Sequence, residues 1–268
     1  MERKNIKKMM KEGQHVFGMV ANMTDPAVIE IAGICGYDFV RLDCEHTPFS
    51  ICEIRNCVRA ADAVGIPLIV RITELDAITG LLDFGVGGFM IPHVRTAEEA
   101  ERIVRDVKYY PVGLRGFSDG ARAQNYGFVD MEEFIRKAND EIVLMCQIED
   151  KYGIANMEEI IAVDGIDGIC TGPNDIAQSL GIPTQTKDIR VKEVERRIIS
   201  TAKKYGKQMF MSAKTPERAK ELMEQGVLAI SVCYDYGALK ETASAKINFY
   251  KELFNKSKSE VEDDKHDS

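Results

Sequence analysis

The sequence predicts an α/β protein folded as a (β/α)8 barrel, the TIM-barrel architecture. Short apolar runs rich in β-branched residues alternate with helical patterns along the whole chain, which favours parallel βαβ units. Eight such units fit into roughly 250 residues, the size typical of this barrel. The turn after the first strand, Ala21–Asp25, lacks the Gly-rich pattern of a doubly wound open sheet, so that fold is the less favoured alternative.

Strands are predicted at Val16–Met23, Asp38–Asp43, Ile66–Thr73, Gly87–Val94, Ile142–Glu149, Gly168–Gly172, Gln208–Ser212 and Leu228–Cys233. Helices are predicted at Pro26–Cys35, Ser50–Val64, Asp76–Phe84, Thr96–Tyr109, Asn156–Val163, Val191–Tyr205, Thr215–Gln225 and Tyr236–Phe254. Gly65 and Gly226 stand where a glycine commonly ends a helix. Thr96, followed by Glu99 at the third position, forms a capping-box pattern at a helix start.

Two segments interrupt this alternation. Pro111–Phe128 is a polar loop, and loops longer than about 12–15 residues in a compact domain are usually functional or disordered. Lys256–Ser268 is highly charged and has almost no apolar residue, which is typical of a disordered tail. We therefore expect a single barrel domain over residues 1–255 and a disordered tail over residues 256–268.

Composition excludes several classes of protein. The net charge of −8 disfavours a nucleic-acid partner, because binding phosphates requires a basic surface. The seven cysteines are odd in number, include no CxxC pair and lie mostly in apolar runs, which indicates buried thiols in a reducing compartment. Met1–Gly13 has no apolar core typical of a secretory signal, and no apolar run of about 18 residues predicts a membrane span. A cytoplasmic location is expected.

Polar residues gather where the predicted strands end, the position of active sites in these barrels. Glu149 and Asp175 each follow an otherwise apolar strand. Two carboxylates with few other ligands suit a cation that keeps several waters, such as Mg²⁺ or Mn²⁺, whereas Zn²⁺ would favour more His or Cys. The alternatives are a helix cap for Asp175 and a surface ion pair for Glu149.

His46, flanked by Asp43 and Glu45, is a candidate general base, although it could be an ordinary loop histidine. Arg71 ends an apolar strand and could hold an anion or stabilise an oxyanion; the alternative is a buried ion pair, with Asp83 as a candidate partner. His93 also falls at a strand end, where it could simply cap the strand.

Taken together, these residues resemble the HpcH/HpaI aldolase family over about residues 5–255. The matching motifs are Asp43–Pro48, Val70–Arg71, Leu81–Gly85, Ile91–Val94, Tyr110–Gly116, Gln147–Glu149 and Gly172–Ala177. Their order and spacing carry the resemblance. The loop Phe117–Gly127 is most similar to the branch that cleaves 2-keto-3-deoxy sugar acids.

The resemblance implies a metal-dependent aldolase that reversibly cleaves 2-keto-4-hydroxy acids into pyruvate and an aldehyde, through an enolate stabilised by Mg²⁺, Mn²⁺ or Co²⁺. It implies a homohexamer whose subunits exchange the last helix. The roles that it implies are metal binding by Glu149 and Asp175, base catalysis by His46 with Asp83 as partner, oxyanion stabilisation by Arg71, and pyruvate contacts from Gln147, Gly172, Pro173 and Asn174.

Three departures from the family pattern bear on the aldehyde pocket. Cys44 replaces a usual Gly, Thr171 replaces an apolar residue, and Ile72–Ala77 is shorter than usual. A condensing enzyme or lyase that uses oxaloacetate or a CoA ester, as in a related citrate synthase, stays an alternative, as does a non-catalytic barrel that binds organic acids. A Schiff-base aldolase would need a buried lysine, and the strand Gly168–Gly172 has none.

Overall fold

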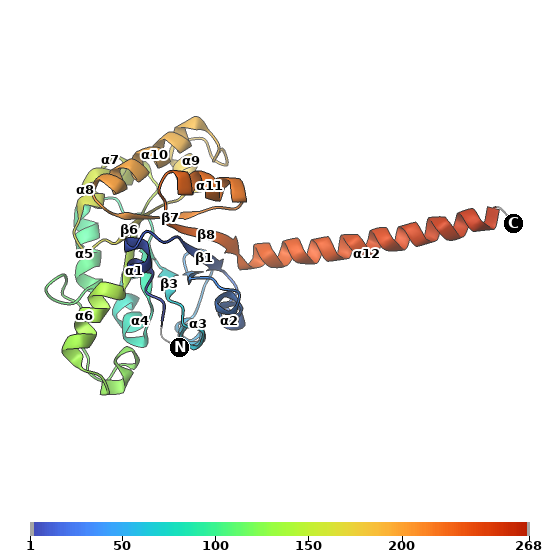
Figure 1. The fold of residues 1–268 in the computed structure, drawn as a ribbon. Coiled ribbons are helices and arrows are strands. Elements are labelled where there is room, and N and C mark those ends of the chain that lie inside the picture. The colour runs from blue at the N-terminus through green and yellow to red at the C-terminus, as the bar shows by residue number, and fades with distance from the viewer. Residues whose placement is uncertain (1–2, 267–268) are drawn as a thin grey trace.

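A computed structural model describes the backbone of residues 3–266 and the side chains of residues 3–255. Within this part of the chain the strands are β1 (Val16–Ala21), β2 (Phe39–Asp43), β3 (Leu68–Arg71), β4 (Gly88–Ile91), β5 (Val143–Ile148), β6 (Gly168–Thr171), β7 (Gln208–Ser212) and β8 (Ala229–Tyr234). Neighbouring strands are parallel and β8 pairs with β1, so the sheet closes into a barrel (Figure 1). The predicted (β/α)8 barrel is confirmed, and each predicted strand overlaps an observed one.

Helices surround the barrel (Figure 1). They are α2 (Ala27–Ile34), α3 (Ile51–Val64), α4 (Ile78–Phe84), α5 (Ala97–Val107), α6 (Met131–Glu141), α7 (Lys151–Ala155), α8 (Met157–Ala162), α9 (Pro173–Ser179), α10 (Ile189–Lys204) and α11 (Pro216–Glu224), with 3-10 turns η1 (Leu75–Ala77) and η2 (Arg122–Gly127). Local sequence explains their ends. At α3, the Ser50 hydroxyl accepts from the Glu53 N–H and the Glu53 carboxylate accepts from the Ser50 N–H, while Gly65 ends the helix at a φ of 70°.

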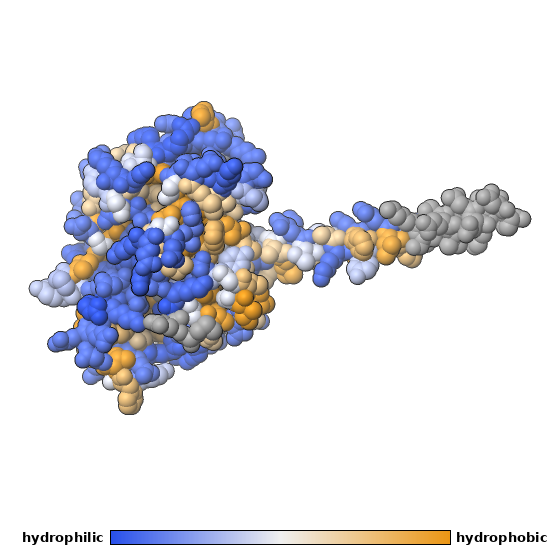
Figure 2. All heavy atoms as spheres, viewed as in Figure 1, coloured by the Kyte–Doolittle hydropathy of each residue, from blue (hydrophilic) through white to orange (hydrophobic). Residues whose placement is uncertain are grey.

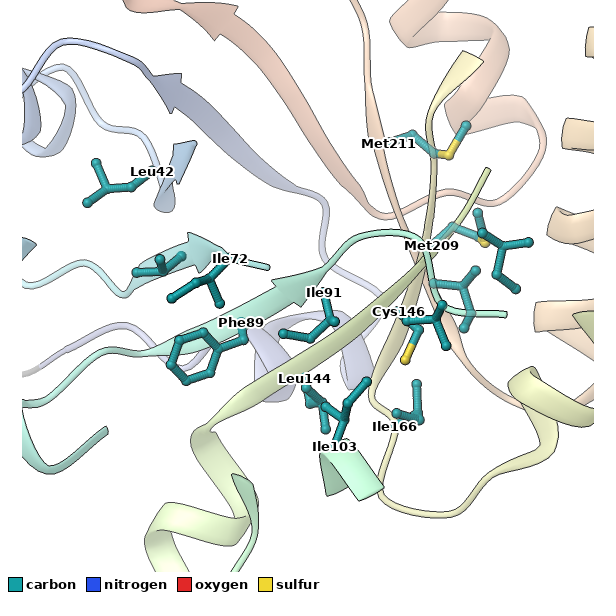
Figure 3. Close-up of a cluster of buried hydrophobic side chains, with 14 of the residues drawn as sticks. Leu42, Ile72, Phe89, Ile91, Ile103, Leu144, Cys146, Ile166, Met209 and Met211 are labelled. Carbon is teal, nitrogen blue, oxygen red and sulfur yellow. The ribbon is translucent and has the colours of Figure 1, made fainter. Parts of the chain in front are cut away.

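The core has two layers. Phe89 of β4, Leu144 of β5 and Ile103 of α5 belong to the cluster between strands and helices (Figure 3). A second cluster fills the barrel itself, where Phe39 and Phe210 meet edge to face with ring centroids 6.2 Å apart. This layering supports the strands with apolar contacts on both faces, as parallel sheets require.

Several observed helices lie outside the predicted ranges, among them α1 and α6. In α1 (Ile6–Lys11), Ile6 and Met10 pack into the inner cluster and close the N-terminal end of the barrel. In α6, Met131, Phe134, Ile135 and Ala138 are spaced as the apolar stripe of an amphipathic helix, so the sequence did carry a helical signal here. The start of α6 is local, because the Asp130 carboxylate accepts from the Glu133 N–H at 2.8 Å.

The last helix, α12 (Asp235–His266), projects away from the barrel (Figure 1). Exposed apolar side chains lie along it: Leu239, Ile247, Phe249, Tyr250, Leu253 and Phe254. The backbone is helical through the segment for which we expect disorder, but the side chains from residue 256 onward lie outside the described part, so the disordered tail stays a prediction. None of the helices in the described residues has the length and apolar content that crossing a lipid bilayer requires.

Candidate active site

The carboxyl ends of β2 to β5 carry a continuous chain of polar contacts. Arg71 contacts Asp43 and Glu45, Glu45 contacts His93, and His93 contacts Glu149. The strands are parallel, so these ends meet at one end of the barrel, the end that carries active sites in this architecture. Four separate segments therefore supply one connected site.

Arg71 ends β3 and is held by two carboxylates. It lies opposite Asp43 in the β2–β3 ladder, and its Nε and Nη2 donate to the Asp43 carboxylate at 3.0 and 2.5 Å. Nη1 lies 3.1 Å from Glu45 Oε2. Burial opposes ionisation of Asp43, but the hydrogen bonds and charge of Arg71 outweigh it and lower the pKa of that carboxyl. The partner of the buried Arg71 is thus Asp43, and the Asp83 partner considered from sequence is wrong.

Glu149 follows β5 and is 1% exposed. Its Oε1 accepts from the His93 backbone N–H at 3.1 Å and lies 3.2 Å from His93 Nδ1, while Oε2 accepts from Gln147 Nε2. Burial raises the pKa of Glu149, His93 lowers it and the nearby Asp175 raises it, and together these effects bring the pKa to about 7. A carboxylate that is so costly to ionise is suited to binding a cation.

Glu149 and Asp175 approach each other at Gly172. A Cβ on Gly172 would lie 2.1 Å from Glu149 Oε2, 2.9 Å from Asp175 Oδ2 and 2.9 Å from Gln147 Nε2, so only glycine fits there. The buried Gln147 Oε1 has no hydrogen-bond partner. This oxygen-rich pocket fits a hard divalent cation.

The donor set is small. No group of three or more His, Cys, Asp or Glu side chains arranged for a metal occurs in the described residues. Glu149 and Asp175 would therefore leave most coordination positions to water or substrate, which is the usual arrangement for Mg²⁺.

His93 has a more central place in the site than its sequence position indicated. Its ring contacts Glu149 through Nδ1 and Glu45 through Nε2, the latter at 3.0 Å. Its φ of 56° is unusual for a residue other than glycine, and such conformations cluster at functional sites. Its strand-end position was the only signal in the sequence.

His46 lies in the turn after β2, with 63% of its side chain exposed. Its backbone N–H donates to Asp43 Oδ1 at 3.3 Å, and Nε2 lies 3.8 Å from Glu45 Oε2. The structure therefore brings His46 to the edge of the site, beside the carboxylates that hold Arg71. Pro173 and Asn174, in the first turn of α9, flank the same pocket next to Gly172.

Asp83 lies away from the polar chain at the carboxyl ends of the strands. It is near the end of α4, and a helix that follows a parallel strand runs back toward the N-terminal end of the barrel. There it accepts from Arg115 Nη2 at 2.6 Å, close to a cavity of about 690 Å³ that Arg115 and Arg122 help to line. The expected pairing of His46 with Asp83 is absent within one chain, so a catalytic role for Asp83 would need a second chain and stays a prediction.

Two of the departures from the family pattern face away from the site. Thr171 donates to Glu195 of α10 at 3.3 Å, and Cys44 packs into the cluster between strands and helices. Neither lines the barrel interior. By contrast, Asn22, which follows β1, donates to Thr47 Oγ1 at 3.1 Å, and its buried Oδ1 is unpartnered.

Known proteins share this fold and length. A family model described as HpcH/HpaI aldolase/citrate lyase matches residues 17–241. A hydroxypyruvate/pyruvate aldolase of Sagittula stellata is 32% identical over 246 residues, which cover 91% of this chain and 96% of that protein. A 5-keto-4-deoxy-D-glucarate aldolase of Salmonella paratyphi C is 31% identical over 236 residues, which cover 87% of this chain and 91% of that protein.

Solved structures agree with these matches. The crystal structure of the citrate synthase SbnG has a TM-score of 0.86 at 31% identity, covering 94% of this chain and 99% of that one. A more distant fold neighbour, CitE from Mycobacterium tuberculosis in complex with magnesium and pyruvate, has a TM-score of 0.54 at 16% identity, covering 82% of this chain and 85% of that one. With most of its length matched by the family model, this chain belongs to the HpcH/HpaI aldolase/citrate lyase family.

Proposed function

We propose that the protein is a metal-dependent aldolase that reversibly cleaves 2-keto-4-hydroxy acids, including 2-keto-3-deoxy acids, into pyruvate and an aldehyde. The observation that carries this proposal is the meeting of Glu149 and Asp175 at Gly172, joined through His93 and Glu45 to Arg71. Relatives at about 31% identity that are themselves aldolases support it.

Glu149 and Asp175 would hold Mg²⁺, Mn²⁺ or Co²⁺, and the bound cation supplies positive charge for the enolate that is left when the carbon–carbon bond breaks. Arg71 adds a second positive charge at the keto oxygen. Asp43 and Glu45 fix its guanidinium from two sides, so Arg71 needs no rearrangement when negative charge develops.

Proton transfer falls to His46 in this proposal. The imidazole takes the proton from the 4-hydroxyl group in cleavage and returns it in addition. Glu45, 3.8 Å away, stabilises the imidazolium that forms. Gln147 and the first turn of α9, with Gly172, Pro173 and Asn174, orient the pyruvate carboxylate, since helix N-terminal N–H groups favour anions.

A second function has a specific observation in its favour. The citrate synthase SbnG is as similar to this chain as the aldolases are, at 31% identity. The alternative is therefore an enzyme that uses the same enolate chemistry on oxaloacetate or a CoA ester in the condensing direction.

The deciding experiment is a coupled assay of pyruvate release from a panel of 2-keto-4-hydroxy acids. We expect EDTA to abolish pyruvate release and Mn²⁺, Mg²⁺ or Co²⁺ to restore it. Turnover that survives EDTA and is trapped by borohydride would overturn the metal assignment. Condensation of oxaloacetate without aldol cleavage would favour the alternative function.

We also propose that the protein forms a homohexamer in which α12 is exchanged between subunits. The helix leaves its own barrel, and its apolar side chains stay exposed in a single chain (Figure 2). Light scattering of the full chain tests this assembly: a monomer at micromolar concentration would contradict it.

A further inference from the structure

Arg41 is a charged residue inside the barrel. Along β2, Val40 and Leu42 face the helices, whereas Phe39 belongs to the cluster inside the barrel. Because side chains alternate along a strand, Arg41 faces the interior with Phe39 and Asp43. Its side chain lies one inward position below Asp43, roughly 6.6 Å along the strand.

The chain leaves this guanidinium without an anionic partner. Arg41 is 9% exposed, its Nη1 contacts the Met90 sulfur at 2.9 Å, and its Nε has no hydrogen-bond partner. It forms no ion pair among the described side chains. Asp43, its neighbour on the strand, uses both carboxylate oxygens for Arg71.

A buried cation without a partner is costly, so its retention calls for an explanation. Burial and the charge of Arg71 lower the pKa of Arg41, and the other groups acting on it are Asp43, Cys170 and Tyr234. Its side chain faces the barrel interior on the strand that ends at Asp43, the partner of Arg71. An anion that reached this guanidinium from the site would supply the missing partner.

We propose that Arg41 is a specificity-determining residue whose guanidinium binds a second carboxylate of the substrate, so that the site favours 2-keto dicarboxylic acids over 2-keto monocarboxylic acids. This inference rests on the proposed function, because the keto-acid end of the same ligand occupies the pocket at Glu149 and Asp175. A planar guanidinium with free N–H groups suits a carboxylate, which it can bind through two parallel hydrogen bonds.

The test compares two probes that differ by a carboxylate and a methyl group. Oxaloacetate loses CO₂, and the electron pair left on C3 takes a proton to give pyruvate, which a coupled assay measures. For 2-ketobutyrate, NMR follows exchange of the C3 protons with deuterium. Both reactions pass through an enolate of the same 2-keto acid unit, and only oxaloacetate carries the second carboxylate.

For Arg41→Met we expect the KM for oxaloacetate to rise at least tenfold, because Arg41 binds the carboxylate before it leaves as CO₂, and the KM for 2-ketobutyrate to change less than threefold. The effect of Arg41→Lys on oxaloacetate should lie between wild type and Arg41→Met, because lysine keeps the charge but not the paired N–H groups. Arg190→Met is the control: it also removes one positive charge, from an exposed ion pair with Asp188, and should leave both substrates unaffected.

An equal rise of KM for both substrates, or no rise for oxaloacetate, would overturn the role of Arg41. If Arg41→Met fails to fold, the same comparison of oxaloacetate with 2-ketobutyrate is made with Arg41→Gln and Arg41→Lys. If the wild type shows no metal-dependent turnover of either probe, the proposed function itself fails. If the wild type acts on both probes and the variants leave the ratio of KM for oxaloacetate to KM for 2-ketobutyrate unchanged, only the inference about Arg41 is refuted.

Discussion

Two buried charge clusters in the barrel differ in how completely the protein satisfies them. Near the N-terminal ends of β5 and β6, the Lys108 ammonium donates to the Asn139 and Ile142 carbonyls at 3.2 and 2.6 Å and to Asp167 at 3.1 Å. Asp167 also pairs with Lys7 at 2.5 Å. Each charge in this cluster has several partners within the chain.

The cluster at the carboxyl ends of the strands is incomplete. Arg41 Nε, Gln147 Oε1 and Asn22 Oδ1 are buried without hydrogen-bond partners, and burial raises the pKa of Glu149 to about 7. Other buried atoms without partners belong to Tyr109, Arg115 and Gln124, away from this cluster. Buried polar groups in native proteins are usually satisfied, so those at the strand ends are consistent with a ligand that completes the proposed site. The first cluster is satisfied within the chain, whereas the second has the open partners that the proposed metal and substrate would fill.

The largest expected effect is on Glu149. We expect Glu149→Gln to lower kcat/KM for aldol cleavage at least 1000-fold, about 4 kcal/mol of transition-state stabilisation, because it removes a charged ligand from the proposed metal site. Mn²⁺ affinity, followed by electron paramagnetic resonance, should fall in parallel. The glutamine should not lower the stability of the metal-free protein, since it relieves the cost of a buried carboxylate.

Glu195→Gln provides the matched control. Glu195 is also buried, at 6% exposed, but it faces Thr171 and Arg218 outside the barrel interior. Activity and Mn²⁺ affinity should persist in this variant. If Glu149→Gln kept full activity and full affinity, the metal site would be wrong.

Changes in the Lys108 cluster should lower stability and leave activity unchanged. We expect Lys108→Met to lower the free energy of unfolding by about 2–4 kcal/mol, because two carbonyls and Asp167 lose a buried partner. Urea denaturation measures this loss. The kcat of the folded variant should match the wild type. A lowered kcat at unchanged stability would contradict the assignment of this cluster to stability and not to activity.

The smallest effect is a pH dependence confined to the site. The pKa of Glu149 is raised from 4.5 to about 7, so the folded state binds more protons than the unfolded state between those values. The Glu149 contribution to the stability of the metal-free protein should therefore decrease as pH rises from about 4.5 to 7. Mn²⁺ competes with that proton, so its affinity should rise about tenfold per pH unit up to about 7 and then level off.

Thermal unfolding and Mn²⁺ titration from pH 5 to 8 check this prediction, with Glu149→Gln as reference. The difference in stability between wild type and variant should follow the predicted slope. A difference that does not vary with pH would contradict the raised pKa.

Much of this protein could be predicted from local sequence. The alternation of strand and helix patterns specified the barrel, because the units carry their own apolar periods and several also carry a helix cap or a terminal glycine. It also marked the strand ends where Arg71, Glu149 and Asp175 lie. The helix α6 was not predicted, although Met131, Phe134, Ile135 and Ala138 are spaced as an apolar stripe, so its signal was present in the local sequence.

Sequence alone therefore determined the fold class and the end of the barrel that carries the polar residues. Only the tertiary structure decided the partners: Asp43 for Arg71, Arg115 for Asp83, and His93 as the link between Glu45 and Glu149. The tertiary structure also showed that Arg41 faces the barrel interior and has no anionic partner among the described side chains. Helix and strand signals are local, whereas these contacts depend on the register of neighbouring strands and on closure of the barrel, which bring together residues far apart in the chain.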